Sequence, residues 1–318
     1  MLTLVRGYFN GVRTVMKQDI RASTILIRSF MLAAVFLVFT QSSVAQNLTF
    51  EDIQKLPSPA GAQRIAYGSD SSQFGELRLP PGKGPYPVAV VIHGGCWFSE
   101  YDLSHLESLN ARLTRLGVAT WSLEYRRLGN PGGGWPGTFV DVAHGTDHLR
   151  KLARSYPLDL KRVIAIGHSA GGQLALWLAA RHRLPNDSPL YTKNPLRLTG
   201  VVSLAGITDL RRYRPNCGDA VTKLLGGSPE AVPDRYQQTS PRDMLPLRVE
   251  QRLIQGTLDK IVPADFSKDY DLAARKSGDS VQLAILPNAG HFDVIAPQSS
   301  AWPSIELAVR SLLRLQKR

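Results

Sequence analysis

The sequence predicts an α/β protein built around a mostly parallel β-sheet. Short apolar runs, such as residues 88–92 and 162–166, are rich in Val, Ile and Ala, which is typical of strands buried on both faces of such a sheet. Eight strand candidates alternate with five helix candidates along residues 63–315, the order of a doubly wound fold. A chain of 318 residues with 43% hydrophobic side chains can bury one large core.

The expected elements follow from hydrophobic periodicity and from the Gly and Pro residues between them. Strands are expected over residues 63–67, 74–79, 88–92, 118–123, 162–166, 198–205, 248–255 and 281–286. Helices are expected over residues 104–116, 138–155, 173–183, 265–277 and 302–315, the first opened by a capping box of Ser104 and Glu107. Residues 46–62 are expected to be irregular. Residues 207–247 interrupt the alternation, and an insertion of about 40 residues is usually a functional cap.

The N-terminus has the pattern of a signal peptide. An apolar run, residues 30–39, follows five Arg or Lys residues and precedes Ser43-Val44-Ala45. The run is short for a membrane span, which needs about 20 residues. We expect cleavage after Ala45, which makes residues 1–45 a signal peptide and residues 46–318 a periplasmic or secreted domain. If the segment stays uncleaved, it is an N-terminal anchor and the only part that contacts a membrane.

Charge, histidine and cysteine content limit the partners. The net charge is +12, of which residues 1–45 supply +4 (five Arg or Lys against Asp19). The other charges are interspersed, so we expect no nucleic-acid partner. His144 and His148 are spaced like a ligand pair, but no third ligand is evident, and we expect no metal. Cys96 and Cys217 form either one disulfide or two unrelated thiols.

The segment Gly167-His168-Ser169-Ala170-Gly171 joins a strand candidate to a helix candidate as a G-x-S-x-G turn. Glycine two places before and after the serine removes Cβ atoms that would collide in a sharp turn. The turn places the Ser169 hydroxyl above the sheet, at a helix N-terminus whose free N–H groups stabilise negative charge. Ser169 is therefore the candidate nucleophile.

A second loop, His93-Gly94-Gly95-Cys96-Trp97, directly follows the strand 88–92. Glycines at this place let backbone N–H groups point into a cleft without side chains in the way. We expect the N–H of Gly94 or Gly95, together with that of Ala170, to bind a developing oxyanion. Trp97 and Trp135 are candidate substrate contacts. Trp135 is equally well explained as a surface residue covering a helix start.

A serine hydroxyl is barely ionised at neutral pH, so a nucleophilic serine needs a base and an acid that orients it. Of seven histidines, only His291 lies C-terminal to residue 182, and it follows the last strand candidate. Asp259 follows the preceding strand, and we favour it as the acid. Asp209, one strand earlier, is the alternative.

These motifs, with Gly256-Thr-Leu-Asp259 and Ala289-Gly-His-Phe292, resemble the α/β-hydrolase family over nearly all of residues 63–315. The similar members include acetyl- and feruloyl-esterases, arylformamidases and the catalytic domains of prolyl-oligopeptidase-type peptidases. The resemblance implies an α/β-hydrolase fold with an eight-stranded, mostly parallel sheet, flanking helices and a small cap. It also implies a Ser169, Asp259, His291 triad in the order of the family and no cofactor. The loop 125–139 departs from the segment that hormone-sensitive-lipase-type esterases carry, so their acyl-pocket details do not transfer.

We expect a carboxylic-ester hydrolase that acts on a small-molecule ester. An amidase or arylformamidase is the first alternative. The predicted export argues against it, because kynurenine breakdown, the chemistry of an arylformamidase, is cytosolic. A prolyl-oligopeptidase-like peptidase comes next, although no propeller or other gating domain precedes the catalytic one. A catalytically silent hydrolase fold used for binding is the non-enzymatic alternative. The sequence fixes neither the acyl and alcohol groups nor the oligomeric state.

Overall fold

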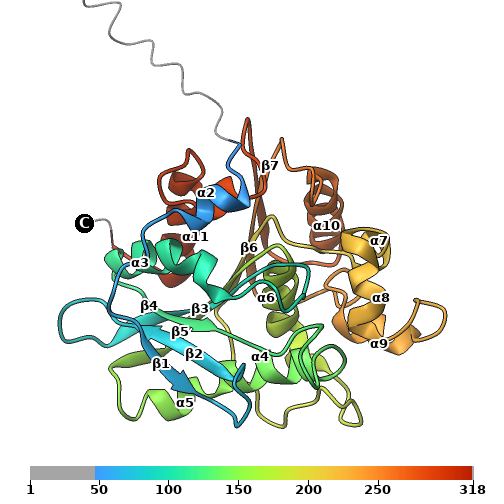
Figure 1. Cartoon of the computed structure of the whole chain (residues 1–318), viewed down its shortest axis with the longest axis horizontal. Helices are drawn as coiled ribbons and strands as arrows, with labels where there is room; N and C mark the ends of the chain where they lie inside the picture. Colours follow the sequence, from blue (N-terminus) through green and yellow to red (C-terminus); the bar gives the residue numbers. More distant parts are fainter. Residues whose placement is uncertain (1–46, 317–318) are drawn as a thin grey trace, which may run out of the picture. The chain divides into compact units, whose positions relative to one another are not determined.

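A computed structural model of the chain describes residues 47–316, shown in colour in Figure 1. The predicted signal peptide, residues 1–45, lies outside the described residues. No helix in the described part of the chain combines the length and the apolar character that a bilayer crossing requires.

One eight-stranded sheet organises the described residues, with the strand order β1-β2-β4-β3-β5-β6-β7-β8. The strands are β1 (Gln63–Ala66), β2 (Phe74–Arg78), β3 (Tyr86–Ile92), β4 (Ala119–Leu123), β5 (Leu158–His168), β6 (Gly200–Leu204), β7 (Glu250–Gly256) and β8 (Val281–Leu286). Pairing is antiparallel between β1 and β2 and between β2 and β4, and parallel from β4 to β8. The predicted eight-stranded, mostly parallel sheet is confirmed. Parallel pairing brings the carboxyl ends of β3, β5 and β7 to the same edge of the sheet.

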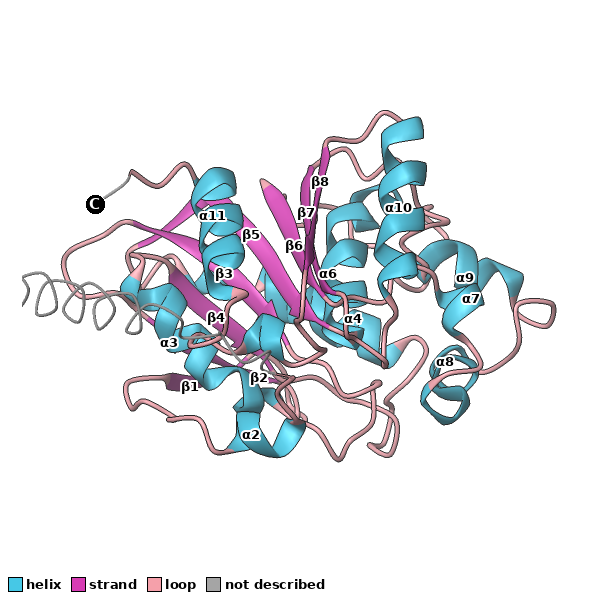
Figure 2. Cartoon of the chain, turned by 90° about the horizontal axis from the view of Figure 1, so that it is seen from above, coloured by secondary structure: helices cyan, strands magenta, loops and turns pink. Residues whose placement is uncertain are grey.

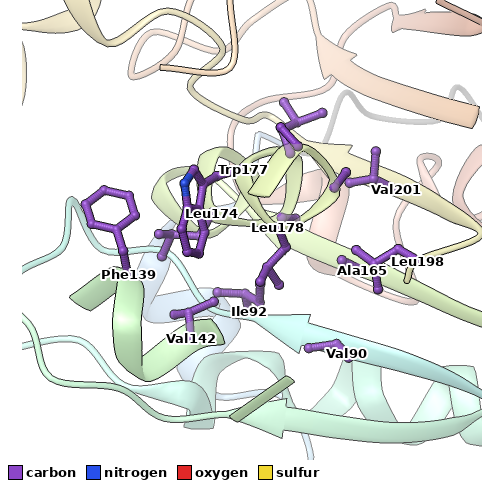
Figure 3. Close-up of a cluster of buried hydrophobic side chains, with 14 of the residues drawn as sticks. Val90, Ile92, Phe139, Val142, Ala165, Leu174, Trp177, Leu178, Leu198 and Val201 are labelled. Carbon is purple, nitrogen blue, oxygen red and sulfur yellow. The ribbon is translucent and has the colours of Figure 1, made fainter. Parts of the chain in front are cut away.

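The centre of the sheet is buried on both faces, because β3 and residues 163–166 of β5 are apolar at every position. In β3, Val88, Val90 and Ile92 join one hydrophobic cluster, while Ala89 and Val91 join the other. Figure 2 shows α4, α6 and α10 on one side of the sheet and α3 and α11 on the other. Figure 3 shows the first cluster, in which side chains of α6 pack beside those of α4 and β3.

Ten α-helices lie within the described residues. They are α2 (Phe50–Gln54), α3 (Glu107–Arg115), α4 (Gly137–Asp147), α5 (Leu149–Leu152), α6 (Ala170–Ala180), α7 (Leu210–Tyr213), α8 (Ala220–Leu225), α9 (Pro233–Thr239), α10 (Ala264–Lys276) and α11 (Trp302–Leu313). All five predicted helical regions contain helix. The helix predicted over residues 138–155 is divided into α4 and α5 at His148.

Two local predictions are wrong. The predicted capping box of Ser104 and Glu107 is absent, because a 3₁₀ turn, η1 (Leu103–Leu106), precedes α3 and leaves that helix without a side-chain cap. Asp102 instead accepts a hydrogen bond from the Ser104 N–H at 2.9 Å. The lead-in predicted to be irregular contains α2, which has its own capping box between Thr49 and Asp52.

The insertion between β6 and β7 carries α7, α8 and α9, the three short helices of the cap. A disulfide joins Cys217, in the turn before α8, to Cys96, which follows β3. Of the two states that the sequence leaves open for the cysteines, the structure therefore has the disulfide. The cap is covalently attached to the loop at the end of β3.

Candidate active site

Ser169 occupies the sharp turn between β5 and α6. Its backbone has φ 56° and ψ −120°, a strained combination for a residue with a Cβ atom. The Ser169 N–H donates to the Leu204 carbonyl at 2.9 Å, which ties the turn to β6. Only 2% of the residue is exposed. Strain held by hydrogen bonding at one residue is typical of a functional site.

The glycines on either side of Ser169 make this turn possible. A Cβ atom on Gly167 would lie 1.9 Å from the Gly171 carbonyl oxygen, and one on Gly171 would lie 2.1 Å from the Ile92 carbonyl oxygen. Both contacts are with backbone atoms, which cannot swing aside as a side chain can. Only glycine therefore fits at these two positions, as the G-x-S-x-G turn predicts.

His291 and Asp259 meet at the carboxyl ends of β8 and β7. The Nδ1 atom of His291 lies 2.7 Å from Asp259 Oδ2, and neither side chain is more than 6% exposed. Asp259 Oδ1 accepts the N–H groups of Ile261 and Val262, and Oδ2 also accepts from the Gln255 amide. These bonds satisfy a buried carboxylate and fix its direction. Nε2 is the imidazole nitrogen that the Asp259 contact leaves free.

Asp209, the alternative acid, lies elsewhere. Its carboxylate accepts the Arg212 N–H at 3.0 Å and so caps the start of α7. Its side chain faces a surface groove lined by residues of α10. The structure therefore places Asp259, and not Asp209, beside His291.

Ser169 and His291 line one cavity of about 110 Å³. The other lining residues are Phe50, Gly95, Cys96, Tyr101, His105, His168, Ile261 and Phe292. Among the described residues no hydrogen bond joins the Ser169 hydroxyl to His291. Catalytic hydrogen bonds are often long in ligand-free sites and tighten when substrate binds.

Three candidate oxyanion donors belong to residues that line this cavity or directly adjoin such a residue. The N–H groups of Gly94, Gly95 and Ala170 make no hydrogen bond within residues 47–316. Ala170 is the first residue of α6, so its N–H belongs to the free, partially positive end of that helix. Gly95 lines the cavity beside Ser169. These N–H groups are therefore free to receive an acceptor from a ligand.

A buried polar network that sequence reasoning missed supports the candidate oxyanion loop, residues 93–97. Glu124 lies 3.1 Å from His93 Nε2 and 2.7 Å from Arg127. His93 Nδ1 donates to the Gly94 carbonyl at 2.8 Å, and the Tyr125 hydroxyl donates to the His93 carbonyl. Burial alone would raise the pKa of Glu124, but His93 and Arg127 outweigh it and lower that pKa. The sequence feature that indicates this network is the polar run Glu124–Arg127 directly after a buried strand.

Two further histidines beside the cavity are neutral. Burial, reinforced by the neighbouring His93, lowers the pKa of His105 to about 3. Burial and the proximity of His291 and His105 also hold the pKa of His168 well below its usual range. His168 Nε2 donates to the His291 carbonyl at 3.0 Å. His168 therefore holds the loop that carries His291.

The two candidate substrate contacts do not line this cavity. Trp97 is completely buried, and its Nε1–H donates to Gln173 at 3.2 Å, so it cannot touch a substrate in this structure. Trp135 packs edge-on against Phe139 and lies under the Arg235 guanidinium. The prediction that Trp97 contacts substrate is wrong, because tertiary packing turns its indole into the core.

Comparisons with known proteins agree with this geometry. A sequence model of the BD-FAE family matches residues 76–273, more than half of the chain. A search of curated proteins finds no match.

Solved structures share the fold at low sequence identity. A truncated carbohydrate esterase from gut microbiota has a TM-score of 0.70 at 20% identity, over 81% of this chain and 98% of the other. An acetyl ester-xyloside bifunctional hydrolase from Caldicellulosiruptor lactoaceticus has a TM-score of 0.64 at 20% identity, over 79% and 95%. A butyrate-bound esterase from Thermogutta terrifontis also has 0.64 at 20% identity, over 80% and 94%.

Proposed function

The chain belongs to the BD-FAE family, an α/β-hydrolase esterase family, and from this we propose that it cleaves carboxylic esters through an acyl–serine intermediate. One observation carries the mechanism. The strained Ser169 and the hydrogen-bonded pair of His291 and Asp259 come from three separate strand ends. Ser169 and His291 line the same cavity. That arrangement supplies a nucleophile, a base and a group that orients the base.

In the proposed reaction, Ser169 Oγ attacks the ester carbonyl carbon and its proton passes to His291 Nε2. Asp259 holds Nδ1 protonated and stabilises the imidazolium that forms. The carbonyl oxygen becomes an oxyanion, which the N–H groups of Ala170 and of Gly94 or Gly95 bind. Losing one such donor typically raises the barrier by about 2.7–4 kcal/mol.

The oxyanion then collapses and the C–O bond to the alcohol breaks, while the alcohol oxygen takes the proton from His291. Water next attacks the acyl–serine ester with His291 as base, and the acid product leaves with Ser169 restored. Every proton transfer in this scheme uses the one imidazole nitrogen that Asp259 leaves free.

Burst kinetics with a short-chain p-nitrophenyl ester test the proposal. A burst of nitrophenol equal to the enzyme concentration is expected with an activated ester whose acylation of Ser169 is faster than the attack of water on the acyl–serine. Ser169→Ala should lower turnover by about 10⁶-fold, as loss of a triad nucleophile does in a measured case. Retention of most activity by that variant would exclude Ser169.

The same assay separates the alternatives. An anilide and an N-formyl arylamine replace the ester in parallel reactions. Faster cleavage of either would favour the amidase, arylformamidase or peptidase activity. If folded protein cleaves none of the three substrates, the result would favour a binding module.

We also propose that the protein is exported and that residues 1–45 are removed. The disulfide between Cys96 and Cys217 supports this, because disulfides persist mainly in oxidising compartments such as the periplasm. N-terminal sequencing of protein recovered outside the cytoplasm should begin at Gln46. A sequence that begins before residue 30 would refute the cleavage.

A further inference from the structure

The N-terminal segment of the described chain reaches the active-site cavity. Helix α2 follows residues 47–49, and its first residue, Phe50, lines the cavity that holds Ser169. In Figure 1 this segment is the blue helix labelled α2, which contacts the turn η1 that precedes α3. One wall of the site therefore comes from outside the sheet and its connecting loops.

The segment is attached to the loop that carries His291. The Asp293 carboxylate accepts the Leu48 N–H at 3.3 Å and the Gly290 N–H at 2.7 Å. Residue 290 also packs tightly against Asn47, whose Oδ1 atom would lie 1.9 Å from a Cβ added at Gly290. Ile53, one turn further along the same face of the helix, is 3% exposed and belongs to the core cluster that includes residues of α3 and α11. The position of Phe50 is therefore fixed by the hydrogen bond at Leu48 before it and by the core contact of Ile53 after it.

The Phe50 ring meets three rings that belong to the cavity wall. Its centroid lies 5.3 Å from that of Tyr101, 5.7 Å from that of His105 and 5.7 Å from that of Phe292. These are edge-to-face or tilted contacts of the kind that fix aromatic side chains. The cavity they line, about 110 Å³, is small beside the roughly 300–1,000 Å³ of pockets for drug-sized ligands.

We propose that Phe50 is a specificity-determining residue that restricts the acyl group to short chains. The inference rests on the proposed ester hydrolysis. In that reaction the acyl group stays bonded to Ser169 while the alcohol must depart, so a small cavity beside Ser169 suits the acyl group. Phe50, Ile261 and Phe292 give the lining of this cavity apolar surface, as an alkyl chain requires.

The experiment measures kcat/KM along two substrate series. One varies the acyl group of p-nitrophenyl esters from acetate through butyrate to hexanoate, and the other varies the alcohol of acetate esters. Phe50→Ala should raise the hexanoate-to-acetate ratio by about tenfold or more, since one methylene in a hydrophobic pocket is worth about 10–200-fold in kcat/KM. Phe50→Trp should lower the same ratio. The alcohol series should not change its order.

Ile53→Ala is the matched control, because it weakens the packing of the same helix without touching the cavity. Its acyl ratio should stay within about twofold of the wild type, while its melting temperature falls as expected for a lost core contact. An unchanged acyl ratio in active Phe50→Ala, an equal shift in Ile53→Ala, or a shift confined to the alcohol series would each overturn the inference. Wild-type protein that cleaves no ester would instead overturn the proposed function.

Discussion

Cys96 and Cys217 are joined by a disulfide across a sequence separation of 121, with their Cα atoms 6.2 Å apart. Cys96 follows Gly95 in the oxyanion loop and lines the active-site cavity. Cys217 belongs to the cap, and its sulfur lies 3.2 Å from the Tyr213 hydroxyl. The covalent bond therefore connects the cap to the loop that carries the candidate oxyanion donors. We expect any displacement of the cap to displace this loop as well.

Removing this disulfide should destabilise the protein and slow catalysis. A cross-link that closes a loop of about 120 residues restricts the unfolded chain by about 4–5 kcal/mol in the loop-entropy account. Urea unfolding with and without dithiothreitol measures the effect, and kcat should fall in parallel. The Cys96→Ser/Cys217→Ser double variant is the control and should not respond to dithiothreitol. Two titratable thiols in the native, non-reduced protein would contradict the prediction.

The acid of the proposed triad can be tested with two matched substitutions. Asp259→Asn should lower kcat by about 10⁴-fold, because an amide at Nδ1 favours the wrong imidazole tautomer. Asp209→Asn should leave kcat within about twofold, and it keeps the α7 cap because Asn caps as well as Asp. Steady-state kinetics on one ester measure both. A larger loss in Asp209→Asn than in Asp259→Asn would reverse the assignment.

The sequence predicted those parts of the structure that short-range patterns determine. The eight strands followed from apolar runs, and Ser169, Asp259 and His291 followed from their places after strands. Phe50 escaped prediction because a helix of only five residues leaves no measurable periodicity, and its role depends on a loop about 240 residues away. Trp97 was misassigned because whether an indole faces a cleft or the core is decided by tertiary packing.

The contact between His93 and Glu124 could not be predicted from sequence motifs either. These residues are 31 positions apart and meet only because β3 and β4 are neighbours in the sheet. Taken one at a time, the motifs show only a histidine before two glycines and an acidic residue after a strand. Only the parallel register of the two strands makes them partners.

Stability should decrease as the pH falls below about 6.5. The pKa of His105 is lowered to about 3 by burial, so the folded protein excludes a proton that the unfolded chain binds below its ordinary pKa of about 6.5. The unfolded state then binds more protons, and the free energy of unfolding falls with pH between these two values. At pH 5 the loss from His105 alone is about 2 kcal/mol. His168, whose pKa is also lowered, adds to it.

Urea unfolding at pH 7.5 and pH 5 measures this loss. His105→Gln cannot take up the proton, so its stability should fall by about 2 kcal/mol less than that of the wild type over the same interval. The quantity compared is the change in unfolding free energy between pH 7.5 and pH 5 in each protein, so any pH-independent cost of the substitution cancels. Equal losses in the two proteins would show that His105 is protonated in the folded state.

Glu124→Gln should damage both stability and catalysis. The substitution leaves the Arg127 guanidinium, whose side chain is 6% exposed, without its carboxylate partner. Breaking a buried ion pair from one side typically costs about 3–5 kcal/mol of folding free energy. It also takes the carboxylate from His93, whose other nitrogen holds the Gly94 carbonyl, so kcat should fall by about 10²-fold as for a lost oxyanion donor.

The double variant Glu124→Gln/Arg127→Met separates the two effects. The single variant is costly because it leaves a buried charge without a partner. The double variant removes that charge as well, so it should regain most of the lost unfolding free energy. Its kcat should stay low, because His93 still lacks the carboxylate that holds the loop. Thermal unfolding and single-turnover acylation rates measure the two quantities separately. Recovery of kcat together with stability would mean that the ion pair acts on folding alone and that Glu124 does not position the oxyanion loop.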